Sequence, residues 1–178
     1  MLEIIVSESE VWDEANNQFI NVPGVKLKLE HSLLSLSAWE SKWCKPFLQD
    51  KEKTEEETID YIRCMTLNPE EVDDSVYTTL SLDNLKAIKD YISAPMTATW
   101  FPPDKRGNRN GEQVTSELIY YWMISLQIPM ECQAWHLNKL MTLIRVCNVK
   151  NQPSKKHGKN DVLRQNAALN AARRKPKV

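Results

Sequence analysis

The chain has 178 residues, of which 42% are apolar and 26% charged, a balance typical of one water-soluble globular domain with a tail. Its four cysteines include no CxxC pair, so a zinc or thioredoxin-type site has no local support. Met1 leads directly into LEIIV without a basic segment or a cleavage site, and we therefore expect a protein of the reducing cytoplasm.

The net charge of −1 conceals two regions of opposite sign. Residues 150–178 contain nine Lys and Arg residues and one acid, Asp161, for a net charge of +8. The rest of the chain holds 14 bases and 23 acids, for a net charge of −9. This asymmetry indicates an acidic body that carries a basic arm.

Alternating apolar residues predict two strands near the N-terminus. LEIIV at 2–6 and VKLKL at 25–29 each place every second, apolar side chain on one face. Pro23-Gly24, just before the second segment, is typical of a tight turn. The sequence therefore predicts a small antiparallel sheet within residues 1–31, which must pack on something because an isolated hairpin is unstable.

Four helix starts are predicted between this sheet and residue 95. They are Ser37, Thr54 with a capping box to Glu57, Asn68 ahead of Pro69, and Ser81. The helix after Ser81 should turn Leu85, Ile88 and Ile92 inward and end at Pro95. The segment PPDKRGNRNG at 102–111 is predicted to be a loop.

The most apolar stretch lies at 115–147. Thr115 or Ser116 can cap a helix through Gln127 whose apolar residues surround its axis, so this helix should lie inside the protein. It is too short for the ~20 apolar residues of a bilayer span, which argues against a membrane segment. A second helix is expected to start at Pro129. The two would pack as a helical hairpin that forms the core.

The second of these helices should bury two stripes and expose a third. The buried stripes are Leu137, Met141 and Ile144, and Leu140, Leu143 and Cys147. Asn138, Thr142 and Arg145 are expected to face away from the core.

Beyond Asn148 the chain reads as a basic linker followed by a weakly amphipathic helix, which we expect to be partly disordered alone and to fold on a partner. Three roles are open for this arm besides simple solubility. It could bind nucleic-acid phosphates, clamp onto the acidic body of a neighbouring copy, or dock an acidic or amphipathic protein. The absence of aromatic residues for base stacking makes nucleic acid the weakest of the three.

No catalytic motif is present: the sequence contains no GxGxxG, P-loop, HExxH or GxSxG pattern. His31 precedes Ser32, but nothing indicates the third, orienting group that a nucleophilic site needs. His136 is interpreted as a hydrogen-bonded histidine at the edge of the core. No catalytic residue, metal site or cofactor is therefore predicted.

The six tryptophans allow two interpretations. Trp39 and Trp43 are spaced to share one helical face, where they could plug the sheet against the helices. Together with Trp135 they could instead form an aromatic patch that binds another protein, because Trp is a strong interface anchor.

Five segments, in this order, resemble a family of small proteins that long-tailed bacteriophages (siphoviruses) encode among their tail morphogenesis genes, the tail assembly chaperones. The segments are HSLLSLSAWESKWCKPFL (31–48), TIDYIRCM (58–65), APMTATWF (94–101), SELIYYWMISLQIPMECQAWHLNKLMTLIRVCNVKN (116–151) and RQNAALNAARR (164–174). The resemblance implies a non-enzymatic protein that binds the long helical tape-measure protein, keeps it soluble and helps to recruit tail-tube subunits. It also implies a longer product made by ribosomal frameshifting. The family has no catalytic residues to carry over.

The combined prediction is an α+β, mainly α-helical chain. It has one globular domain at 1–150, β-rich at 1–31 and helical at 32–150, and a flexible basic helical arm at 151–178. The expected function is that of a tail assembly chaperone in the host cytoplasm, with tape-measure and tail-tube proteins as partners, a homo-oligomer as one option, and neither membrane nor nucleic acid. The expected partner-binding residues are Trp39, Trp43, Trp135, Arg164, Arg173 and Arg174.

The alternative function is a structural protein of the virion, either a head–tail connector or a tail component, that acts through protein contacts. A third option is a small nucleic-acid-binding regulator. Stoichiometric presence in purified particles would favour the virion protein over a chaperone that leaves.

Overall fold

The computed structural model describes residues 1–13, 17–49, 51–101, 113–151, 163 and 167. The chain divides into two compact units, Met1–Cys147 and Asn148–Val178. The predicted arm at 151–178 lies outside the described residues except for Asn151, Leu163 and Ala167, and so do three of the predicted binding residues, Arg164, Arg173 and Arg174.

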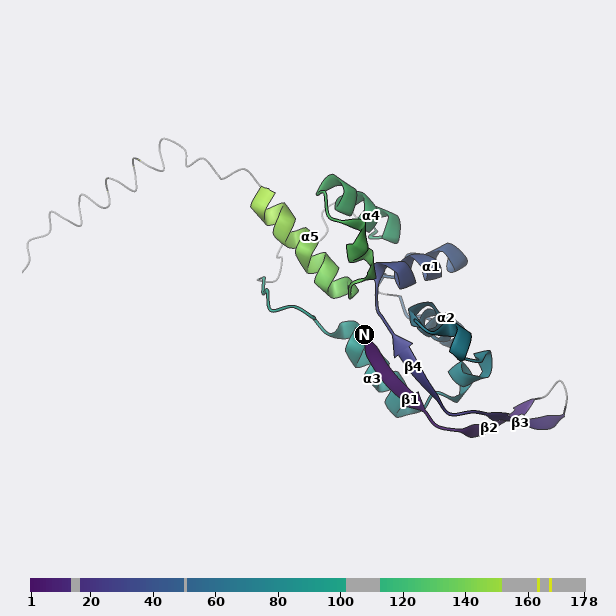
Figure 1. Ribbon diagram of the computed structural model, residues 1–178. Coiled ribbons are helices and arrows are strands. Elements are labelled where there is room, and N and C mark those ends of the chain that lie inside the picture. The colour runs from purple at the N-terminus through teal and green to yellow at the C-terminus, as the bar shows by residue number, and fades with distance from the viewer. Residues whose placement is uncertain (14–16, 50, 102–112, 152–162, 164–166, 168–178) are drawn as a thin grey trace, which may run out of the picture. The chain divides into compact units, whose positions relative to one another are not determined.

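The prediction of a mixed, mainly helical chain with a small N-terminal antiparallel sheet is confirmed (Figure 1). The strands are β1 (Leu2–Val6), β2 (Ser9–Asp13), β3 (Gln18–Val22) and β4 (Val25–Leu29). The helices are α1 (Leu33–Trp43), α2 (Glu55–Met65), α3 (Leu82–Ser93), α4 (Ser116–Ser125) and α5 (Leu137–Asn151). Three 3-10 helices complete the described elements: η1 (Pro69–Glu71), η2 (Asp74–Thr79) and η3 (Met130–Ala134).

The four strands form one long hairpin that is interrupted in the middle. β1 pairs with β4, and β2 pairs with β3. Val6 stands opposite Val25 and Ser9 opposite Val22, so the register runs on unchanged past Pro23 and Gly24. The chain therefore reverses between β2 and β3, and the predicted turn at Pro23-Gly24 was wrong.

Pro23 and Gly24 instead fit a break in the ladder. Proline has no N–H to give to the opposite strand. The backbone at Gly24 comes so close to its partner that an added Cβ would lie 3.2 Å from the Glu8 amide nitrogen. The pair marks a close strand contact, which has the same residue signature as a turn.

The predicted alternation in β1 and β4 holds. Ile4, Val6, Leu27 and Leu29 are buried, whereas Ile5 is 74% exposed. The buried face of this pair of strands therefore packs on the helical part of the chain, as an isolated hairpin requires.

Helix α1 begins five residues earlier than predicted. Its N-cap is Ser32, whose hydroxyl accepts from the Ser35 amide, and the Ser35 hydroxyl in turn accepts from the Ser32 amide. This is a capping box with serine in the place of the usual Glu or Gln, and for that reason the sequence pattern at Ser37 was misleading. The helix ends at Cys44, which adopts a left-handed φ of 51°.

The predicted caps Thr54, Ser81 and Thr115 are confirmed at the starts of α2, α3 and α4. The helix expected after Asn68 is only the single turn η1. The Asn68 side chain does not cap it, because Asn68 hydrogen-bonds to the backbone of Lys26 and Lys28 in β4. A long-range contact thus replaces the local one.

Two predictions about the apolar stretch were wrong. Helix α4 is not surrounded by protein, since Tyr121 is 63% and Ile124 67% exposed. The helix expected from Pro129 is only the 3-10 helix η3, and α5 starts later, at Leu137. The two helices do not form a simple hairpin, because α4 packs chiefly on α1.

Asn138, at the start of α5, is another correction. It was expected to face away, but its side-chain amide donates to the carbonyl oxygens of Ile92 and Ala94 at 3.0 and 2.8 Å. These carbonyls belong to the end of α3, where a helix leaves backbone acceptors without partners. Asn138 therefore joins the start of α5 to the end of α3.

The described part of Met1–Cys147 contains two hydrophobic clusters. The first combines the strands with α2, α3 and Trp39. The second combines the start of α1 with α4, η3 and α5. Phe47 contacts both. Across the described residues, none of the helices has the length and apolar content needed to cross a bilayer.

Candidate binding groove

The three tryptophans predicted to bind a partner occupy different environments. Trp39 is 1% exposed, and its indole N–H donates to the Glu57 carbonyl oxygen at 2.9 Å. Trp43 is half-buried and donates to the Asp60 carboxylate at 2.8 Å. Trp135 is 38% exposed, beneath the Lys139 ammonium. Trp39 is therefore packed in the core, as one interpretation expected.

His31 and His136, the residues closest to a catalytic pattern, form a buried pair. They are 2% and 6% exposed, with ring centroids 5.1 Å apart. His136 Nδ1 accepts from the Asn138 amide, so Nε2 carries the proton and donates to the Tyr91 carbonyl oxygen at 3.0 Å. His31 Nδ1 lies 2.6 Å from the Tyr61 hydroxyl.

These bonds tie the two hydrophobic clusters together. The Leu137 amide donates to the His31 carbonyl oxygen at 2.7 Å. Ser32 and His136 form an isolated antiparallel β-bridge. The Ser32 hydroxyl bonds to Ser35 and not to a histidine. The pair therefore has a structural role at the junction of the clusters.

Burial lowers the pKa of His31 from 6.5 to about 4; His136 acts in the same direction and Glu30 opposes it. Between about pH 6.5 and pH 4, His31 is therefore protonated in the unfolded chain and neutral in the folded chain. We expect this group to remove about 2 kcal/mol of stability as the pH falls from about 7 to about 5. In His31→Asn, which keeps a polar atom near the Nδ1 position, that loss should be absent. Urea unfolding at several pH values measures it, and parallel curves for the two proteins would contradict it.

An open apolar groove lies between α2, α3 and the segment that connects α1 to α2. Its volume is about 590 Å³. The apolar lining comes from both helices and the connecting segment and consists of Phe47, Tyr61, Ile62, Leu85, Ile88 and Ile92. Polar residues also line it: Glu52, Lys53, Thr58 and Lys89. This volume is within the range of ligand sites in proteins.

Helical spacing explains the α3 wall of the groove. In α3, Leu85, Ile88 and Ile92 recur at spacings of three and four, which places them along one face. In α2, Tyr61 and Ile62 face the groove as well. The Tyr61 ring stacks on Phe47 with centroids 3.9 Å apart.

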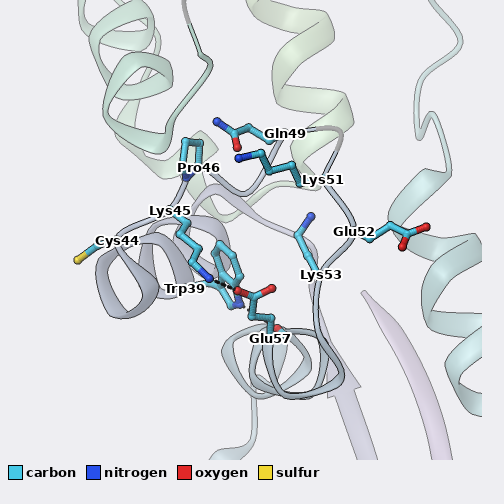
Figure 2. A pocket seen from close by; sticks show the side chains of 9 residues that line it. All are labelled: Trp39, Cys44, Lys45, Pro46, Gln49, Lys51, Glu52, Lys53 and Glu57. Atoms are coloured by element: carbon cyan, nitrogen blue, oxygen red, sulfur yellow. Dashed lines mark hydrogen bonds and ion pairs between the residues drawn. The ribbon is translucent and has the colours of Figure 1, made fainter.

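Two smaller hollows adjoin the groove at Lys53. One, of about 190 Å³, shares Lys53, Thr58 and Leu85 with it. The other, of about 390 Å³, shares Glu52 and Lys53 and is drawn in Figure 2. Lys53 thus lies where three hollows meet.

The lysines of this region differ in their partners. Figure 2 shows Lys45 directed at Glu57, with which it forms a salt bridge of 2.5 Å. The Lys53 ammonium lies 4.2 Å from the centroid of the Phe47 ring. Burial lowers the pKa of Lys53, and Glu57 opposes this effect. Lys53 is therefore a partly desolvated cation on the rim of an apolar groove.

Residue spacing indicates only the α3 wall of the groove. The predicted inward stripe of Leu85, Ile88 and Ile92 is confirmed, since Ile88 is buried in the first cluster and Leu85 and Ile92 pack against it. The same three residues line the groove. The contribution of Phe47 and Tyr61 could not be anticipated, since it depends on how the segment after α1 folds back over α2.

A second apolar surface lies on α4, where Tyr121 and Ile124 are exposed. Among the described residues, no three His, Cys, Asp or Glu side chains are grouped to hold a metal ion. No protein-family model, curated protein or solved structure matches this chain.

Proposed function

We propose that the protein is a tail assembly chaperone of a long-tailed bacteriophage, which binds a helix of the tape-measure protein in the groove between α2 and α3. It acts in the host cytoplasm by binding alone, without catalysis. The observation that carries the proposal is the open apolar groove between α2 and α3.

The apolar lining of the groove is compatible with a helical client, because an amphipathic helix can lay its apolar face into such a groove. Leu85 and Ile92 of α3 are the half-buried apolar side chains that would meet that face. A long tape-measure helix carries an apolar stripe that would aggregate if it were left exposed. A chaperone that covers part of this stripe would keep the tape-measure protein soluble.

We expect the double substitution Leu85→Ala and Ile92→Ala to weaken binding of a tape-measure fragment at least tenfold. Both side chains line the groove and are half-buried against the first hydrophobic cluster, so their removal takes contact area from the groove and less from the core than the loss of a fully buried residue would. Isothermal titration calorimetry with the purified fragment measures the effect.

The matched control is Leu82→Ala. Leu82 is on the same helix but is 85% exposed and does not line the groove, so its removal should leave the affinity unchanged. Circular dichroism should first show that the wild type and both variants are folded. Equal affinities of these three proteins for the fragment would then contradict binding in the groove.

A further inference from the structure

Two lysines on the groove stand out against the charge of the body. Residues 1–149 carry a net charge of −9, yet Lys53 and Lys89 both line the apolar groove. Among the described residues, neither lysine forms a salt bridge. The groove also has one acid, Glu52, whose carboxylate points away from the Lys53 ammonium in Figure 2.

Lys53 is the more informative of the two, because its position costs free energy. A half-buried ammonium that has an aromatic ring beside it but no bonded carboxylate is partly desolvated without full compensation. Glu57, the carboxylate that raises the pKa of Lys53, is already bonded to Lys45 and to the Thr54 amide. A carboxylate delivered by a bound partner would supply the missing interaction and be desolvated with it.

We infer that the groove is selective for an amphipathic helix whose apolar stripe is flanked by acidic side chains, placed so that carboxylates reach Lys53 and Lys89. This rests on the proposed function and specifies the chemistry of the client segment. The apolar stripe supplies affinity, and the two lysines supply orientation and discrimination against basic helices. The chain's own segment 150–178, with nine bases and one acid, has the wrong sign for this requirement.

Two designed peptides of about 18 residues test the inference, a length at which an isolated helix is viable. They share one Leu stripe and differ only in their flanks, which are Glu in one and Lys in the other. The unaltered protein should bind the Glu-flanked peptide about tenfold more tightly at low salt, and the difference should shrink as salt is added.

Variants of the full chain assign this preference to the two lysines. Lys53→Glu with Lys89→Glu should reverse it, and Lys53→Gln with Lys89→Gln should abolish it. Lys86→Glu is the matched control. Lys86 is exposed on α3, the helix that carries Lys89, but it does not line the groove, so the preference for the Glu-flanked peptide should persist. The Gln variant keeps the test valid if the Glu variant fails to fold.

Equal affinity for the two peptides, or a preference that survives in the Gln variant, overturns the inference. Failure of both peptides to bind overturns it as well. The proposed function is judged separately by the tape-measure fragment and the Leu85→Ala, Ile92→Ala protein, so it stands if that fragment binds in the groove regardless of charge.

Discussion

Trp39→Ala is expected to lower the free energy of unfolding by about 3–5 kcal/mol, the range found when a large aromatic residue is removed from a core. The side chain is 1% exposed and packs against the rings of Trp43 and Phe47. Its removal also takes away the bond to the Glu57 carbonyl oxygen that joins α1 to α2. Urea unfolding followed by circular dichroism measures the loss.

Trp135→Ala is the matched control. Trp135 is 38% exposed, and its substitution should cost about 1 kcal/mol or less. A Trp39→Ala protein with unaltered stability but lost client binding would show that Trp39 is an interface residue after all.

Glu40→Ala is expected to cost roughly 3 kcal/mol, because this carboxylate holds two distant parts of the chain together. Glu40 is 7% exposed; Oε1 accepts from the Phe47 amide at 2.8 Å and Oε2 from the Ser116 amide at 2.7 Å. Ser116 is the first residue of α4, so the negative charge also complements the positive end of that helix. Removing the carboxylate leaves two amides that are buried or partly buried without an acceptor.

Glu40→Gln should fall between the wild type and the alanine variant, since its amide can replace only one of the two acceptors. Glu56→Ala, at an exposed position in the first turn of α2, should lower stability by about 1 kcal/mol or less, through its interaction with the helix dipole. Chemical denaturation of the three variants measures the order. Equal stability of Glu40→Ala and Glu56→Ala would mean that Glu40 does not hold α4 in place.

Features that depend on neighbours in sequence could be predicted. The caps Thr54, Ser81 and Thr115 act on amides three residues away, and the alternating faces of β1 and β4 follow from strand geometry. Such interactions are complete within one turn or one strand, so residue type and spacing are sufficient to predict them.

Features decided by distant partners could not be predicted. Asn68 and Asn138 carry the residue type of a helix cap and of an exposed helical position, yet their amides bond to β4 and to the end of α3. The role of Glu40 as an acceptor could not be predicted, because its donor Ser116 lies 76 residues further along the chain.

The candidate site shows the same division. The tryptophans were predicted to bind a partner because Trp is a frequent interface anchor. The buried Trp39 shows that residue type alone does not place a side chain on the surface. In the fold, α3 lies along β1 while α2 packs on α1 (Figure 1). The groove between α2 and α3 results from this arrangement. No local sequence pattern predicts the separation of α2 and α3.

The most direct test of the proposed groove is a titration of the isotope-labelled protein with a tape-measure fragment, followed through backbone amide signals in NMR spectra. Binding in the groove should shift the amides of α2 and α3 that line it, in particular Thr58, Ile62, Leu85 and Lys89. Shifts concentrated on α4, around Tyr121 and Ile124, with the groove amides unmoved, would contradict it.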